Sequence, residues 1–115
     1  MRLQPKYEEE ALLTRQFVFE GDRLYLNLKA EYPYSYARVE ILDAEMEPIE
    51  GFGREDCEPV HGDSICHEVR WKKGADVSPL WNQPIRLKIH LRESWLYSYR
   101  FGYAQQKGAN GSRDR

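Results

Sequence analysis

The chain has 115 residues, of which 41% are hydrophobic and 31% charged, with a formal net charge of −2 at pH 7. This length fits one domain with its own core, and the near-neutral charge gives no electrostatic basis for binding nucleic acid. No apolar run approaches the roughly 20 residues needed to cross a bilayer, and residues 1–10 lack the apolar core of a signal peptide. We therefore expect neither nucleic acid nor a membrane as a partner, and the cellular compartment stays open.

The first third of the chain predicts a polar leader followed by a β-hairpin. Residues 1–11 are polar with three consecutive glutamates and predict a leader or linker. Residues 13–20 predict a strand with Phe17 and Phe19 on one face, and the following Glu-Gly-Asp predicts a turn. The leucines at 24, 26 and 28 predict the buried face of a second strand, with Tyr25 pointing outward.

The middle of the chain predicts short strands separated by turns and one long loop. Proline interrupts the pattern at 32–36, and residues 38–42 then predict a strand with Val39 and Ile41 inward. Residues 43–48 predict a turn, 49–52 a short strand and 53–64 an irregular loop. Residues 65–71 predict a strand with Trp71 inward, and 76–80 predict one helical turn capped by Asp76.

The last third holds the clearest strand. Residues 85–92 alternate strictly between aliphatic and basic side chains, which predicts a half-buried strand with His90 on its solvated face. Residues 95–103 predict an aromatic strand with its odd positions on one face, and 104–115 a disordered tail. About seven to eight short strands predict an all-β, antiparallel two-sheet β-sandwich, jelly-roll or Ig-like, over residues 12–103.

Several short motifs together resemble a known family. They are FVFEGD (17–22), RVEILDA (38–44), PIEGF (48–52), EDC (55–57), GDS (62–64), VRWK (69–72), PIRL (84–87) and LYSYRF (96–101). This set resembles the C-terminal β-sandwich appended to bacterial glycosidase-like proteins whose main domain is a five-bladed β-propeller. The resemblance places the catalytic carboxylates in the propeller, so it implies an accessory role with a propeller domain, or a second copy, as partner. Met46 stands where that family usually has glycine, and the aromatic run 32–36 is not part of the resemblance.

The residues themselves favour no catalytic or metal site. Four carboxylates crowd the loop region, but on one small segment they are more readily explained as backbone hydrogen-bond acceptors than as a glycosidase pair; they are Glu55, Asp56, Glu58 and Asp63. Oxygen and nitrogen donors near His61 and His67 allow a calcium site, but the spacing matches no metal motif. We expect no catalytic residue, no metal and no cofactor.

Four aromatic residues suggest the most specific functional hypothesis, which is carbohydrate binding. Tyr34, Tyr36, Trp81 and Trp95 fall in loops or at strand ends, where rings can stack on the apolar faces of sugars. The alternative is that these rings pack against the sandwich or a neighbouring domain. The resemblance therefore implies a non-catalytic accessory domain of a glycosidase-like protein that serves mainly in interdomain packing, and the exposed aromatics leave weak carbohydrate binding as the alternative. Cys57 and Cys66 allow either a disulfide or two independent thiols.

Overall fold

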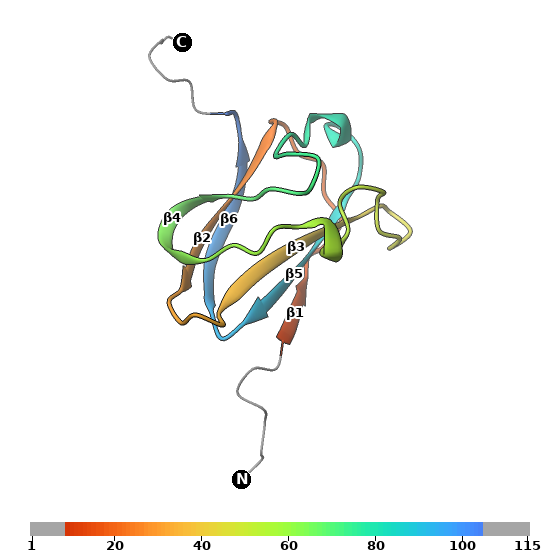
Figure 1. Ribbon diagram of the computed structural model, residues 1–115. Coiled ribbons are helices and arrows are strands. Elements are labelled where there is room, and N and C mark those ends of the chain that lie inside the picture. The colour runs from red at the N-terminus through yellow and green to blue at the C-terminus, as the bar shows by residue number, and fades with distance from the viewer. Residues whose placement is uncertain (1–8, 105–115) are drawn as a thin grey trace.

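A computed structural model describes residues 9–104, which form six strands in two antiparallel three-stranded sheets packed face to face (Figure 1). The first sheet has the order β1-β5-β3 and the second the order β4-β2-β6. The strands are β1 (Glu9–Leu13), β2 (Arg23–Ala30), β3 (Tyr36–Leu42), β4 (Gly62–Glu68), β5 (Arg86–Arg92) and β6 (Trp95–Gly102). Two single 3₁₀ turns, η1 (Arg54–Asp56) and η2 (Ser78–Leu80), complete the described elements. The all-β two-sheet sandwich is confirmed, with six strands in place of the seven to eight expected.

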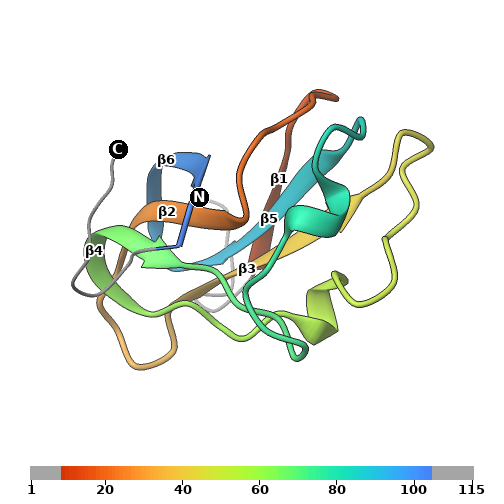
Figure 2. The same cartoon turned by 90° about the horizontal axis from the view of Figure 1, so that it is seen from above.

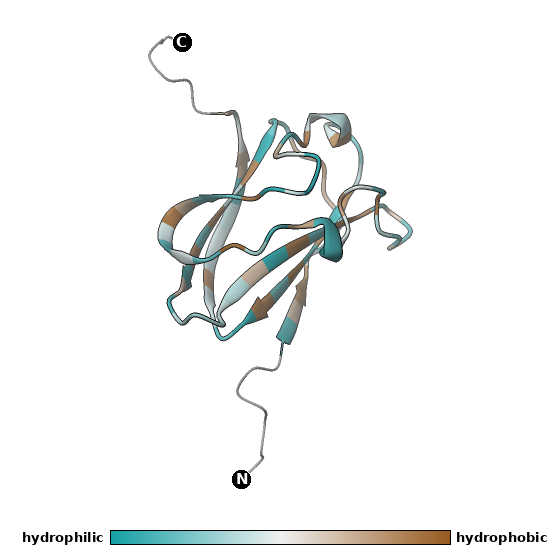
Figure 3. Cartoon of the chain, in the orientation of Figure 1, coloured by the Kyte–Doolittle hydropathy of each residue, from teal (hydrophilic) through white to brown (hydrophobic). Residues whose placement is uncertain are grey.

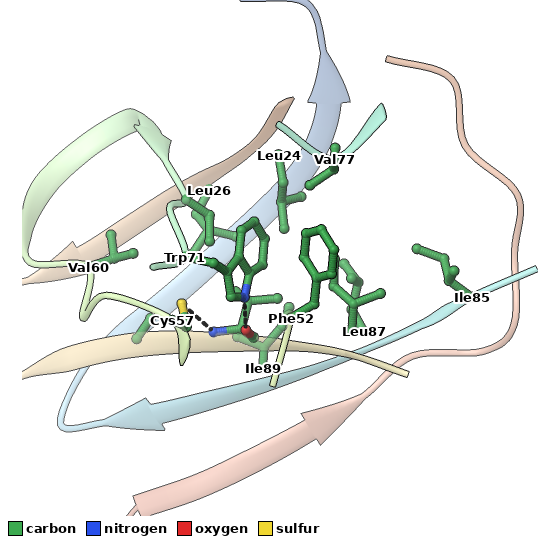
Figure 4. Close-up of a cluster of buried hydrophobic side chains, with 14 of the residues drawn as sticks. Leu24, Leu26, Phe52, Cys57, Val60, Trp71, Val77, Ile85, Leu87 and Ile89 are labelled. Carbon is green, nitrogen blue, oxygen red and sulfur yellow. Dashed lines mark hydrogen bonds between the residues drawn. The ribbon is translucent and has the colours of Figure 1, made fainter. Parts of the chain in front are cut away.

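Alternating side chains build the core between the sheets, as the sequence predicts. In β2 the three leucines at 24, 26 and 28 are fully buried, and in β5 so are Leu87 and Ile89. Figure 3 shows the resulting alternation of hydrophobic and hydrophilic positions along β3 and β5. The inward positions of both sheets form one cluster with Trp71 at its centre (Figure 4). Burial of this continuous apolar surface is the main force that holds the two sheets together.

The expected hairpin of the first two strands is wrong, because these strands belong to different sheets. β1 pairs with β5, and β2 pairs with β4 and β6. The strand predicted at 13–20 ends at Leu13, and residues 9–11, expected in the leader, belong to β1. The chain then crosses from the first sheet to the second. In this crossing segment, Phe17 forms an isolated antiparallel β-bridge with Ile85. Phe17 and Phe19 still point toward the interior, where both rings contact Phe101.

Two expected strands in the middle of the chain also differ. Residues 49–52 form a turn, in which the Phe52 amide donates to the Ile49 carbonyl and Gly51 has a φ of 89°, so the turn is too tight for a strand. β4 begins at Gly62, three residues before the expected position, and ends at Glu68. Trp71 is buried as expected, and the Asp76 carboxylate accepts a hydrogen bond from the Ser78 amide at the start of η2.

The aromatic strand β6 changes face part-way along. Its register against β2 shifts between Asn27 and Leu28, which is a β-bulge. Leu96 therefore packs toward the core together with Tyr99, whereas Trp95 and Tyr97 are 56% and 62% exposed. The prediction that the odd positions of β6 all share one face is wrong, because the extra residue inverts the alternation.

The side of the sandwich along β3 is closed by loop residues. Figure 4 shows the two side chains that cap the middle of the β3 edge: Cys57 Sγ accepts from the Val39 amide at 3.2 Å, and Trp71 Nε1 donates to the Val39 carbonyl at 3.0 Å. On either side, the backbone of Val60 bonds Ala37 and the carbonyl of Phe52 accepts from the Ile41 amide. The backbone groups of this edge are therefore satisfied without another strand.

The opposite side, formed by β1 and β6, is partly open. Figure 2 shows these two edge strands on the same side of the sandwich, away from β3 and β4. Phe17 and Phe19 cover the part of this side that contacts Phe101. Leu12 shares the inner face of its sheet with its partner Ile89 but is 47% exposed. Leu91 and Leu96 are only partly buried. We call Leu12, Leu91 and Leu96 the open rim.

Candidate functional site

The four residues predicted to bind carbohydrate do not form one platform. Trp95 begins β6, whereas the ring of Trp81 contacts that of Tyr103 beyond the other end of β6, with centroids 6.1 Å apart. An eight-residue strand spans roughly 25 Å, so Trp81 and Trp95 lie at opposite ends of the second sheet. Tyr34 belongs to the turn after β2, near the Trp95 end, and Tyr36 begins β3 in the other sheet.

Tyr36 is occupied by neighbours within the protein. Its hydroxyl donates a 2.6 Å hydrogen bond to Glu9 Oε2. The guanidinium carbons of Arg38 and Arg92 lie 5.6 and 5.8 Å from the centre of its ring, which is cation–π distance. The ring and the hydroxyl both take part in a polar network on the outer face of the first sheet, so Tyr36 is poorly placed to receive a sugar.

This network, which we call the Glu9 cluster, joins β1 to β3, β5 and η1 through Glu9, Tyr36, Glu40, Arg54 and His90. Arg54 Nε donates to Glu9 Oε1 at 3.0 Å, and a second guanidinium nitrogen bonds the other Glu9 oxygen. The His90 ring lies between two carboxylates, 3.3 Å from Glu9 and 3.2 Å from Glu40. The expectation that His90 is solvated is wrong, because β1 covers it and leaves its side chain 9% exposed.

The cluster shifts the pKa values of Glu9 and Tyr36. Hydrogen bonds from Arg54, then from Tyr36, lower the pKa of Glu9 to about 2 and outweigh the opposing effect of burial. Burial, reinforced by the bond to Glu9, raises the pKa of the Tyr36 hydroxyl. A general acid or base works best with a pKa near the working pH. Glu9 is therefore a permanent carboxylate suited to anchoring β1, and a poor proton carrier at neutral pH.

Sequence reasoning missed the Glu9 cluster because it assigned Glu9 to the leader. The only signal was the apolar run of residues 11–13 directly after the glutamates, which is compatible with a strand that begins earlier. Glu9 meets Arg92 and His90 only through the pairing of β1 with β5, and no local pattern encodes that pairing.

The acidic and histidine-containing loop forms structural hydrogen bonds. Asp56 accepts from the Gly53 amide at 3.3 Å, as predicted for a loop-stabilising carboxylate. His67 is partly buried, as expected, with Nε2 3.1 Å from the Gly62 carbonyl, and His61 Nδ1 lies 2.7 Å from the Ser35 carbonyl. Both histidines line a shallow hollow of about 220 Å³ together with Glu58. Within residues 9–104, no group of three or more His, Cys, Asp or Glu side chains is placed to hold a metal ion.

The two cysteines are independent thiols and not a disulfide. Cys57 is buried beside Val39, and Cys66 is exposed on β4. Burial raises the pKa of the Cys57 thiol to about 11, so it stays neutral at physiological pH. Cys57 thus serves as a small buried side chain that caps a strand edge.

A second hollow, which sequence reasoning also missed, lies at the η2 end of the sandwich. It has a volume of about 390 Å³, and its apolar lining includes Phe52, Trp71 and Leu80. Lys73 and Asp76 also line it. Two segments that are distant in sequence, residues 49–52 and 71–80, meet here, so no short motif predicts the hollow.

The end of the sandwich at the β2–β3 turn carries the remaining exposed aromatics. The rings of Tyr32 and Tyr34 stack in parallel, with centroids 5.5 Å apart and planes at 4°, and Tyr32 is 48% exposed. Ser35 donates from its amide to the Tyr32 carbonyl and from its hydroxyl to the Glu93 carbonyl. These bonds hold the turn against the β5–β6 connection, so the aromatic side chains stand on a fixed loop.

No family model, no curated protein and no solved structure matches this chain. Among residues 9–104, no helix is long and apolar enough to span a bilayer.

Proposed function

We propose that this chain is a non-catalytic accessory β-sandwich of a glycosidase-like protein, and that it packs against a neighbouring β-propeller domain. The motifs that resemble such sandwiches support this role. The observation that carries it is the open rim, where Leu12 belongs to the inner face of its sheet yet remains 47% exposed. Leucines that face a core are normally covered, and uncovered apolar surface of this kind is typical of an interface.

The surroundings of the rim fit this role. Within residues 9–104, five of the nine large exposed hydrophobic side chains lie on β1, on β6 or directly after β6, which concentrates apolar surface near these two strands; the five are Leu12, Leu13, Trp95, Tyr97 and Tyr103. The Glu9 cluster anchors the start of β1 beside the rim. In the resembling proteins the sandwich follows the propeller, so the preceding domain would connect through β1.

Amide hydrogen exchange tests the proposal, measured on this chain alone and within the intact propeller-containing protein. We expect added protection in β1 and β6 of the intact protein, because the propeller covers the open rim, and unchanged exchange in β3 and β4. Leu12→Asp should abolish the added protection, whereas Ile65→Asp, at a side chain 78% exposed on β4, should leave it intact. Equal exchange in both proteins, or protection confined to β3 and β4, would contradict the proposal.

A further inference from the structure

One end of the second sheet presents a mixed row of side chains on its outer face. Lys29 of β2 is directly paired with Asp63 of β4 and with Trp95 of β6. Directly paired residues of antiparallel strands point to the same face. The neighbouring Leu28 is buried in the core, so this row points outward. We call Asp63, Lys29 and Trp95 the terminal row.

The β2–β3 turn, which follows the Lys29 end of β2, carries a second exposed aromatic surface. Tyr32 follows Lys29 by three residues and stacks on Tyr34, and its side chain is 48% exposed. Glu31 lies between them, 52% exposed, with a carboxylate oxygen 3.8 Å from Lys29 Nζ. The bonds from Ser35 to Tyr32 and Glu93 hold the turn in place, so little conformational entropy would be lost when a ligand binds.

We propose that the terminal row and Tyr32 form a binding site for a neutral pyranose of a glycan chain. The indole of Trp95, 56% exposed, offers a flat apolar surface for the C–H face of a sugar ring. Lys29 and Asp63 supply a donor and an acceptor for its hydroxyl groups. Two carboxylates, Asp63 and Glu31, accompany one ammonium, which disfavours anionic sugars such as uronates.

This site is separate from the open rim. Trp95 is on the outer face of the second sheet, whereas Leu12 and Leu96 are on the inner faces of their sheets. The site also replaces the four-residue platform expected from the sequence. Trp95 remains in it, Tyr34 supports Tyr32 by stacking, and Tyr36 and Trp81 fall outside it.

Titration with cellohexaose and maltohexaose, followed by NMR of the backbone amide and tryptophan indole resonances, tests the site directly, because the amides still report binding when Trp95 is replaced. We expect the Trp95 signal to shift with at least one of the two sugars, with a Kd of about 0.1–1 mM, as a small open site allows. Trp95→Ala and Tyr32→Ala should each weaken binding about fivefold, because one stacking contact is worth about 1 kcal/mol. Both side chains are exposed, so the variants should fold normally.

Tyr103→Ala is the matched control, since Tyr103 is 54% exposed at the opposite end of β6. It should bind the sugars as the unmodified chain does. No shift with either sugar at 10 mM (about ten times the weakest expected Kd), equal losses in Tyr103→Ala and Trp95→Ala, or tighter binding of polygalacturonate would each overturn the proposal. Leu12→Asp should leave sugar binding unchanged, so failure of the docking role and failure of the sugar site are distinguishable.

Discussion

The Glu9 carboxylate accepts hydrogen bonds from two other segments of the chain, and these bonds determine its pKa. Arg54 and Tyr36 donate to it, and His90 lies 3.3 Å away. Because its pKa is lowered to about 2, the folded protein favours the ionised form more than the unfolded chain does. The stabilisation is therefore present above the ordinary glutamate pKa and is lost as the pH falls toward 2.

Replacing Glu9 with glutamine should expose this contribution. We expect Glu9→Gln to lower the free energy of unfolding by about 2 kcal/mol at pH 7, because charge-assisted hydrogen bonds to Arg54 are lost. The difference in the free energy of unfolding between Glu9→Gln and the unmodified chain should shrink between about pH 5 and pH 2, because Glu9 itself becomes neutral there. This range roughly spans the pKa values of Glu9 in the unfolded and folded states. Urea unfolding at several pH values measures it.

Glu10→Gln is the control for this prediction. Glu10 is the next residue of β1 and is exposed, so its replacement should change the free energy of unfolding by less than about 0.5 kcal/mol. A loss in Glu9→Gln that stays constant down to pH 2 would show that the carboxylate charge is not what anchors β1.

For individual residues, sequence patterns predict which side chains point inward but not which polar side chains contact each other. The full burial of Leu24, Leu26 and Leu28 follows from period-2 alternation alone. The contact of His90 with Glu9 and Glu40 depends on pairings between distant strands. Tyr25 illustrates the same limit: it points outward as expected but is 4% exposed, because the Arg100 guanidinium lies 4.6 Å from its ring centre.

The edge of β3 shows how side chains replace a missing strand. Trp71 Nε1 and Cys57 Sγ bond the carbonyl and the amide of Val39, which an adjacent strand would otherwise do. An unprotected edge invites pairing with another chain. Residues 53–60, part of the irregular loop predicted at 53–64, therefore help to protect the β3 edge through Cys57 and Val60.

Trp71→Phe should test this cap. The substitution removes the indole N–H that donates to the Val39 carbonyl and leaves a gap in the core, so we expect a loss of about 2–3 kcal/mol in the free energy of unfolding. Trp95→Phe makes the same chemical change at an exposed ring and should cost less than about 0.5 kcal/mol. Similar losses in both variants, measured by urea unfolding, would show that the bond to Val39 contributes little.

Element boundaries depend on details that alternation does not show. The register shift in β6 between Asn27 and Leu28 turns Tyr97 to solvent, although its spacing predicts burial beside Tyr99. Met46 adopts a φ of 70° in the turn after β3. Glycine adopts this region of backbone conformation most readily, because it has no Cβ.

For the whole molecule, the sandwich class was predictable and the strand order was not. Alternating strands separated by turns at short intervals specify two packed sheets. The sheet orders β1-β5-β3 and β4-β2-β6 require crossings between sheets, which local sequence does not encode. The separation of Trp81 from Trp95, and with it the division of the expected aromatic platform, follows from this order.

Thiol labelling reports on the cooperativity of the whole molecule. At pH 8 in native buffer, a thiol reagent should modify the exposed Cys66 quickly and spare Cys57, whose burial raises its pKa to about 11. In denaturant both thiols should react. Cys66→Ser should then show no fast labelling in native buffer, and rapid labelling of that variant would show that the closed side opens without global unfolding.

The early position of β1 decides where a fragment of this protein can safely begin. Judged by composition alone, residues 1–11 could be removed. However, Glu9 and its neighbours complete the first sheet and cover His90. A gene fragment starting at residue 12 would leave Arg54 without its main carboxylate and most of the β5 edge unpaired. Fragments that start at residue 9 or earlier retain the whole sheet. Fragments that start at residue 12 should aggregate more readily, because the exposed edge of β5 can pair with another chain.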